Sequence, residues 1–197
     1  MIKYLENKVL DRQSISREDA FSIASFPAQD IFELFNSSNK IKFRYRGNTV
    51  DLCAIINAKS GACPEDCSYC AQSSQSTAEI KPFSLVEKNI ILEKAREAKQ
   101  GGAKRFCIVT SGKKSSGTDL IKIAEMISEI RLLGLLPCAT LGLLSKDELV
   151  FLKSAGLERY HHNLETSERF FSEICTTHTY QDKIKTIREV KSAGLSL

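Results

Sequence analysis

Hydrophobic and polar residues after residue 50 follow one recurring order: a helical stretch, a glycine, and a short apolar run. The helical stretches end at Gly101, Gly134, Gly156 and Gly194. The apolar runs are residues 105–110, 136–141 and 159–164, and a similar run at 50–58 precedes the first helix. Alternation of helix and strand predicts parallel strands joined by crossover helices.

Local signals mark the starts of the predicted helices. Ser84 with Glu87 and Ser145 with Glu148 have the spacing of a capping box. Thr118 or Asp119 opens the helix that ends at Gly134, and the last helix is expected to cover about residues 180 to 192. The connections are short, as βα units require. The repetition alone allows either an open sheet or part of a (β/α) barrel.

The first 48 residues predict short helices that precede this α/β part. Ser16 followed by Glu18 and Asp19 is a typical helix start, with acidic residues in the first turn. A second helical stretch within residues 29–39 is expected to stop at its Asn/Ser cluster. We therefore expect an N-terminal helical segment, 1–48, and an α/β domain, 49–197.

The composition is that of an ordinary soluble globular protein. Of the 197 residues, 42% are hydrophobic and 26% charged, and the net charge is +4 without a basic block. Nucleic acid is therefore not an expected partner. No apolar run approaches the roughly 20 residues that a membrane span needs. The polar, acid-containing start resembles neither a signal peptide nor a transit peptide, so a cytoplasmic location is expected.

Three of the seven cysteines lie in the loop sequence CPEDCSYC with the spacing C-x3-C-x2-C: Cys63, Cys67 and Cys70. In a reducing compartment, clustered cysteines indicate metal binding or catalysis. Three thiolates can bind one side of an iron–sulfur cluster and leave one iron open to a small molecule. The alternative is a zinc site with His161, His162 or a remote cysteine as fourth ligand.

Two further cysteines occupy matching places in successive βα units. Cys107 lies five residues after Gly102, and Cys138 lies four residues after Gly134. Adjacent parallel strands would carry them at similar heights on one side of the sheet. Cys53, within the apolar run 50–58, is expected to be a small core residue.

The loop SGACPEDCSYCAQSS resembles the cluster loop of the radical S-adenosylmethionine (SAM) enzymes and, within them, of the biotin synthase family. RFCIVTSG, PCATLGLLS, AGLERYHHNLETS and ICTTHTYQDK each resemble a segment of that family, in the same order. The resemblance implies a (β/α)8 TIM-type barrel, of which this chain would carry about five parallel strands. It also implies that the chain is truncated at its C-terminal side.

The resemblance further implies the activity and the cofactors. The family is a sulfurtransferase that converts dethiobiotin to biotin by inserting sulfur, using radical chemistry supplied by cofactors and not by a catalytic side chain. Cys63, Cys67 and Cys70 would hold a [4Fe–4S] cluster that binds S-adenosylmethionine. Cys107 and Cys138 would be two ligands of a [2Fe–2S] cluster whose third cysteine and arginine have no counterpart here, so this site is expected to be incomplete.

Family likeness also assigns binding residues and partners. Asn163, Glu165 and Tyr69 would contact S-adenosylmethionine, and Asn163 and His161 would lie near dethiobiotin; strand alternation puts His161, Asn163 and Glu165 on one face. The structural alternative for both histidines is ordinary strand packing. A flavodoxin or ferredoxin would donate electrons, and a homodimer is allowed.

Two other functions stay open at this point. One is another radical SAM enzyme, of the hydrogenase-maturase type, against which Cys107 and Cys138 argue. The other is a non-catalytic protein that binds zinc or an iron–sulfur cluster. Metal identity separates this second alternative from the enzymes.

Overall fold

A computed structural model of the chain describes residues 1–115 and 117–197, and its contacts divide it into two compact units, Met1–Val50 and Asp51–Leu197. The first unit contains only helices. They are α1 (Ile2–Leu10), α2 (Arg17–Ala24), the 3-10 turn η1 (Ala28–Asp30) and α3 (Ile31–Arg46). Ser16 caps α2 through a capping box with Asp19, which confirms the helix start predicted there.

Helix α3 is longer than the sequence pattern predicted. It continues through the Asn/Ser cluster, where a stop was expected, to Arg46. The reason is a tertiary contact, because Ser37 is buried and its hydroxyl donates a hydrogen bond of 2.5 Å to the Glu6 carboxylate of α1. A polar residue that is satisfied by a neighbouring helix no longer competes with its own helix backbone.

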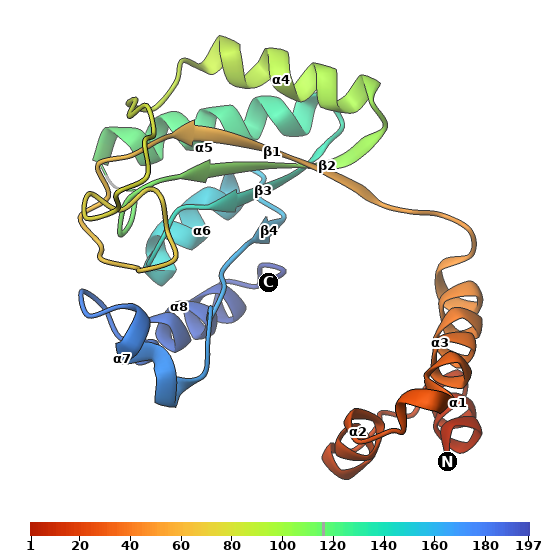
Figure 1. Cartoon of the computed structure of the whole chain (residues 1–197). Helices are drawn as coiled ribbons and strands as arrows, with labels where there is room; N and C mark the ends of the chain where they lie inside the picture. Colours follow the sequence, from red (N-terminus) through yellow and green to blue (C-terminus); the bar gives the residue numbers. More distant parts are fainter. Residues whose placement is uncertain (116) are drawn as a thin grey trace. The chain divides into compact units, whose positions relative to one another are not determined.

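The second unit is a parallel α/β fold, as predicted. Its strands are β1 (Leu52–Lys59), β2 (Ala103–Thr110), β3 (Leu136–Thr140) and β4 (Arg159–Tyr160), in the spatial order β1-β2-β3-β4. The helices are α4 (Lys88–Gln100), α5 (Gly117–Leu132), α6 (Lys146–Ser154), η2 (Glu168–Phe170), α7 (Phe171–Ile174) and α8 (Tyr180–Ser192). Sequential strands pair in order, as in the first part of a (β/α) barrel (Figure 1).

The sheet has four strands in the part of the chain that the structure describes, against the expected five. Ser196 makes a single parallel bridge with Arg159, so pairing continues beyond β4 at the last residues of the chain. Strand β4 is also shorter than the expected 159–164, although the His161 amide still donates to the Ala139 carbonyl at 2.8 Å.

The two faces of the sheet differ in what covers them. Side chains of α4 and α5, such as Ile91, Ile123 and Ile127, pack against Phe106 and Ile108 of β2 to form the core. In Figure 1 these two helices lie along the same side of the strands. The opposite face carries the alternate residues and includes both strand cysteines.

Three details of the sequence prediction are wrong for identifiable reasons. Cys53 is exposed, not a core residue, and Ile55 on the same face of edge strand β1 is 63% exposed. The helix expected from Ser84 begins only at Lys88, because Val86 is still extended and its amide donates to the Ala58 carbonyl at 2.9 Å. The capping box of Ser84 and Glu87 therefore does not form, and Glu87 is the N-cap without a side-chain bond.

Two further helix predictions are confirmed, whereas α5 already begins at Gly117, before the expected Thr118 or Asp119. Ser145 and Glu148 form the predicted capping box of α6, and α8 covers the expected residues with Thr179 as its cap.

Among the described residues, none of the helices combines the length and the apolar character that crossing a membrane requires.

Candidate functional site

The cysteine loop leaves the C-terminal end of β1 through a sharp turn. Gly61 and Ala62 both have positive φ, 71° and 49°. At Gly61 a Cβ would come within 2.8 Å of the Pro82 side chain, so the turn requires glycine on both counts. The Gln72 side chain accepts hydrogen bonds from the Gly61 amide and, at 3.0 Å, from the Ser60 hydroxyl. The start and the end of the loop are thus tied together.

Backbone hydrogen bonds also fix the inside of the loop. The Cys63 amide donates to the Gln72 carbonyl at 3.1 Å, the Ser74 amide to the Cys63 carbonyl at 2.9 Å, and the Cys70 amide to the Cys67 carbonyl at 3.0 Å. Cys63 is buried, and Cys67 and Cys70 are half-buried. All three are free thiols that line one cavity of about 450 Å³ at the C-terminal ends of the strands.

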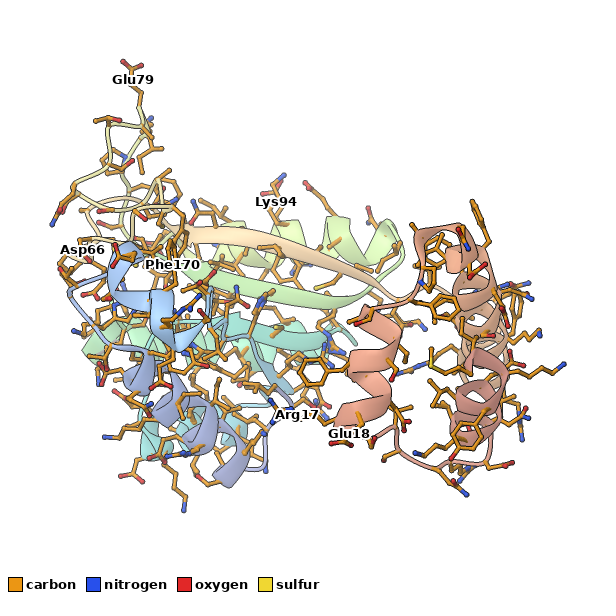
Figure 2. The ribbon with its side chains drawn as sticks, turned by 60° about the horizontal axis from the view of Figure 1, so that its bottom comes forward. Arg17, Glu18, Asp66, Glu79, Lys94 and Phe170 are labelled. Atoms are coloured by element: carbon orange, nitrogen blue, oxygen red, sulfur yellow. The ribbon has the colours of Figure 1, made fainter. Side chains whose placement is uncertain are left out.

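A segment more than a hundred residues downstream holds the loop. The Asp66 carboxylate accepts from the amides of Thr176 and Thr177 at 2.9 and 3.2 Å and from both their hydroxyls. The Ser68 amide donates to the Ile174 carbonyl at 2.9 Å. These bonds, those of Thr176 first, hold the pKa of Asp66 well below its ordinary value. Figure 2 shows Asp66 and Phe170 at the same end of the sheet.

Cys67 also meets this segment directly. Its Sγ lies 3.7 Å from the Sγ of buried Cys175. Cys175 Sγ is in turn 3.2 Å from Nδ1 and 3.8 Å from Nε2 of buried His178, and that Nδ1 is hydrogen-bonded to the buried Glu65 carboxylate. Partial burial, followed by the Cys175 contact, raises the pKa of Cys67 to about 12. In the chain without metal, Cys67 is therefore a neutral thiol.

The loop trio suits a cluster better than a single ion. Among the described residues, only Cys67, Cys175 and His178 bring three ligand atoms within 4.8 Å of one another. Cys63, Cys67 and Cys70 do not converge to the spacing of one zinc ion, and neither His161 nor His162 joins them. Three separated thiolates around an open cavity match the donor set of an iron–sulfur cluster.

The residues expected to bind S-adenosylmethionine lie on the same cavity. Asn163 and Glu165, which follow β4, line it together with Tyr69 of the cysteine loop, which is 53% exposed. Partial burial, with Cys67 and Glu165 nearby, raises the pKa of Tyr69. Glu165 has φ of 68°, a left-handed conformation that costs an ordinary residue about 1 kcal/mol. Strain of this kind is concentrated at functional sites.

The two neighbouring histidines are placed differently from each other. His162 lines the cavity, its buried Nε2 has no hydrogen-bond partner among the described residues, and its ring stacks on Tyr160. Burial lowers the pKa of His162 to about 4. His161 is exposed, and its Nε2 lies 2.8 Å from Asn163 Oδ1. Simple strand alternation does not extend this far, because β4 ends at Tyr160.

The two strand cysteines lie side by side, as the glycine offsets predicted. Cys107 of β2 is in direct register with Cys138 of β3, and both are buried. A hydrogen bond from Cys107 and the guanidinium groups of Arg105 and Arg159 lower the pKa of Cys138. One buried nitrogen of each arginine has no hydrogen-bond partner among the described residues. Unpartnered donors beside two thiols fit an anionic sulfur ligand at this place.

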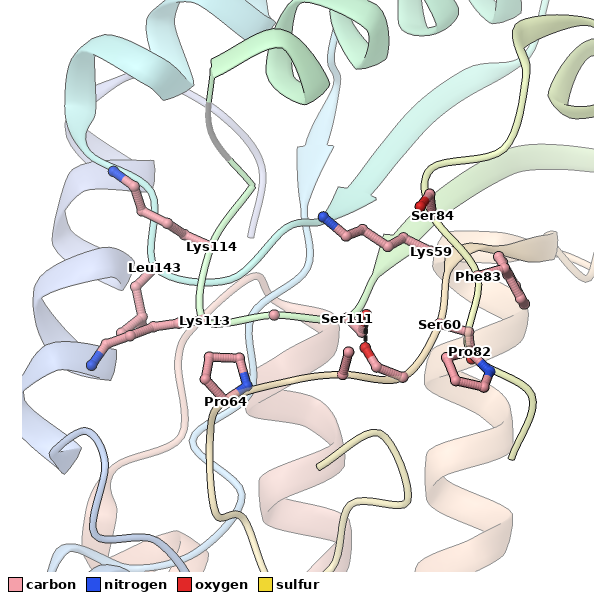
Figure 3. A pocket seen from close by; sticks show the side chains of 13 residues that line it. Lys59, Ser60, Pro64, Pro82, Phe83, Ser84, Ser111, Lys113, Lys114 and Leu143 are labelled. Carbon is pink, nitrogen blue, oxygen red and sulfur yellow. Dashed lines mark hydrogen bonds between the residues drawn. The ribbon is translucent and has the colours of Figure 1, made fainter. Parts of the chain in front are cut away.

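A second cavity, of about 610 Å³, adjoins the loop on its other side (Figure 3). The Ser111 hydroxyl donates to the Gly61 carbonyl at 2.8 Å across it. Its three lysines are paired within the chain: Lys59 with Asp119, Lys113 with the Thr177 carbonyl, and Lys114 with Glu148. Because all three ammonium groups already have partners within the chain, this cavity is a weaker candidate for a ligand than the cysteine-lined one.

Sequence reasoning missed several residues that shape the site. The sequence pattern gives Glu65 and Asp66 no role beyond the CPEDCSYC motif, and it gives none to Cys175, Arg105 or Arg159. The hydrogen-bond partners of Glu65 and Asp66 lie about 110 residues further along the chain, so no local spacing marks them. For the arginines a signal was available, since Arg105 precedes Cys107 by two residues and shares its strand face.

Curated proteins with similar sequences are biotin synthases. One from Thermodesulfovibrio yellowstonii is 52% identical over 167 residues, which cover 85% of this chain and 53% of that protein. One from Clostridioides difficile is 44% identical over 197 residues, 98% of this chain and 61% of that protein. The chain therefore spans a little more than half the length of these relatives.

Two solved structures of other enzymes have folds similar to that of this chain. Methylornithine synthase aligns with a TM-score of 0.79 at 19% identity, covering 97% of this chain and 56% of that one. The FeFe-hydrogenase maturase HydG from Carboxydothermus hydrogenoformans aligns with a TM-score of 0.79 at 17% identity, covering 98% of this chain and 46% of that one. At these identities the likeness establishes the fold.

The sequence profile of the radical SAM superfamily matches residues 58–197, from the end of β1 to the last residue. This match includes the three loop cysteines, the downstream segment that holds them, and strands β2, β3 and β4. The chain belongs to the radical SAM superfamily, whose members combine a [4Fe–4S] cluster with S-adenosylmethionine.

Proposed function

We propose that this chain carries the radical-generating site of a biotin synthase, which inserts sulfur into dethiobiotin to form biotin. The observation that supports this most strongly is the combination of three cysteines in the loop after β1 with Cys107 and Cys138 in register on β2 and β3, in a chain 52% identical to a biotin synthase over 167 residues. The fold neighbours, at 17–19% identity, do not favour another substrate.

In this proposal Cys63, Cys67 and Cys70 hold the [4Fe–4S] cluster. When bound, the cluster supplies the electron that cleaves S-adenosylmethionine to methionine and a 5′-deoxyadenosyl radical. The chain contributes the rigid loop, because Gly61, Gln72 and Asp66 fix the thiols before the metal arrives. A loop that is already ordered loses less conformational entropy on binding.

The cavity residues would orient S-adenosylmethionine and the substrate. Glu165 can accept hydrogen bonds from two ribose hydroxyls, and the Asn163 amide can both donate and accept. The exposed Tyr69 ring offers a flat face for adenine stacking. Asn163 and His161, 2.8 Å apart, are the proposed contacts to dethiobiotin.

Cys107 and Cys138 would contribute two ligands to a [2Fe–2S] cluster. The unpartnered guanidinium nitrogens of Arg105 and Arg159 fit such an anionic group, because they can donate to its sulfur atoms. The other ligands would come from residues that are not in this sequence. A flavodoxin or ferredoxin is the proposed electron donor.

The test is a metal analysis followed by a cleavage assay on the anaerobically reconstituted chain. We expect about four irons per chain in the loop cluster, and 5′-deoxyadenosine whose formation increases when dethiobiotin is added. Glu165→Ala should lose S-adenosylmethionine binding, while Glu168→Ala, a nearby exposed residue bonded to Gln181, should retain it. Stoichiometric zinc without iron would contradict the proposal.

A further inference from the structure

The cysteine loop and the downstream segment are joined so that one cysteine of each lies opposite the other. Two hydrogen bonds of 2.9 Å connect them in reverse order: the Ser68 amide to the Ile174 carbonyl, and the Thr176 amide to the Asp66 carboxylate. The two segments therefore run in opposite directions. The residues between the two bonds are Cys67 and Cys175, and their Sγ atoms are 3.7 Å apart.

This arrangement suits a disulfide bond. Two cysteines can be bridged when their Cα atoms lie within about 7 Å of each other, and directly opposed residues of antiparallel segments are about 4.5–5.5 Å apart. The Cys175 side chain is also held from other sides, because its Sγ is 3.2 Å from His178 Nδ1 and 3.6 Å from Thr177 Oγ1. Closing the bond therefore needs rotation of two side chains and no large movement of the backbone.

We propose that Cys67 and Cys175 are a thiol oxidation site, at which the chain without a cluster forms a disulfide when a small-molecule disulfide such as oxidised glutathione is present. Half-buried Cys67 exchanges first and becomes a mixed disulfide, which releases one glutathione thiol. The sulfur of buried Cys175 then displaces the second glutathione thiol. The two protein thiols lose two electrons and two protons, and the two released glutathione thiols carry them.

The disulfide and the loop cluster exclude each other, because both use Cys67. An oxidised chain keeps only two of the three loop thiols that the cluster of the proposed function requires. A dithiol reductant restores the third thiol. The exclusion rests on the proposed function, whereas formation of the disulfide does not depend on it.

The disulfide is tested on the full metal-free chain, equilibrated anaerobically in mixtures of oxidised and reduced glutathione, alkylated, digested and analysed by mass spectrometry. The reaction is measured at equilibrium, because Cys67 is a neutral thiol and exchanges slowly. We expect a link between Cys67 and Cys175 that persists in the double variant Cys63→Ala/Cys70→Ala. Cys53→Ala is the matched control and should keep the link, because that cysteine is exposed on β1.

A variant of the neighbouring acid tests whether the pairing of the two segments favours the disulfide. Asp66→Asn should shift the equilibrium roughly 2- to 10-fold toward the reduced thiols, because it weakens the hydrogen bonds beside Cys67. Asp147→Asn, the same charge change in the first turn of α6, should leave it unchanged. A link that joins only other cysteines, or a chain that stays reduced at the highest share of oxidised glutathione, would overturn the inference. Far-UV circular dichroism confirms that each variant is folded.

The exclusion is tested on the chain reconstituted with iron and sulfide before oxidised glutathione is added, with the cluster absorbance followed throughout. While this absorbance persists, the link between Cys67 and Cys175 should be absent. A link at the yield of the metal-free chain, with unchanged absorbance, would contradict the exclusion and remove Cys67 from the proposed cluster ligands. The disulfide of the metal-free chain would still stand, so the failure of one proposal is distinguishable from that of the other.

Discussion

The two groups of cysteines in this fold are positioned by different means. Cys107 and Cys138 lie in register on neighbouring strands, and the hydrophobic core under β2 and β3 fixes them. Cys63, Cys67 and Cys70 lie on a loop whose Glu65 and Asp66 carboxylates are hydrogen-bonded to residues 176–178. The strand pair therefore shares the stability of the whole unit, whereas the loop trio can open locally while the sheet remains folded.

The largest expected effect is on the loop iron–sulfur cluster, which should depend on the loop cysteines and not on the strand cysteines. Cys70→Ala removes one of three thiolates and should abolish the loop cluster and S-adenosylmethionine cleavage. Cys107→Ala should leave the loop cluster intact, because its thiol lies on the sheet. Mössbauer and absorption spectra of the reconstituted variants measure this. Loss of the loop cluster in Cys107→Ala would show that the two groups are not independent.

The next effect concerns the sheet alone. Ile108 is fully buried next to Cys107, and Ile108→Ala should lower the free energy of unfolding by about 2–5 kcal/mol. Ile121→Ala on α5, where the side chain is 55% exposed, should change it by less than about 0.5 kcal/mol. Urea unfolding, monitored by circular dichroism, measures the unfolding midpoints of the two variants. Equal midpoints would mean that the β2 core does not stabilise the unit.

A smaller effect should be confined to the loop. Asp66→Asn removes a charged acceptor that receives hydrogen bonds from Thr176 and Thr177. We expect faster hydrogen exchange at the amides of these two residues, with little change in the urea midpoint. Asp147→Asn in the first turn of α6 is the control, because it removes the same single negative charge at a place away from the loop. A large shift in the midpoint would show that loop and sheet unfold together.

A separate effect, confined to acid pH, is a pH dependence from His162. Burial lowers its folded pKa to about 4, below the ordinary value of about 6.5, so the unfolded chain binds the extra proton first. Stability should therefore decrease as the pH falls from about 6.5 toward 4, and His162→Phe should show a shallower decrease. Unfolding midpoints at several pH values test this. An identical pH profile in the variant would exclude His162 as the source.

Sequence reasoning predicted the strand pair better than the loop, for a physical reason. Glycine-terminated helices and short apolar strands fix the βα register, and that register sets Cys107 opposite Cys138. The loop depends on Asp66 and Glu65, whose partners are long-range and follow no period. The failed predictions have the same origin: α3 continues because Ser37 meets Glu6, and Cys53 is exposed because helices cover only the other face of β1.

The bond between Asp66 and Thr177 joins residues that are 111 positions apart. A ribosome that adds about 5–20 residues per second makes the cysteine loop roughly 6 to 22 seconds before the segment that holds it. During that interval the three thiols leave the exit tunnel without their tether, and Cys67 lacks its neighbour Cys175. Cluster insertion that requires the ordered loop consequently has to wait for the synthesis of residue 178, and not only for that of the cysteines.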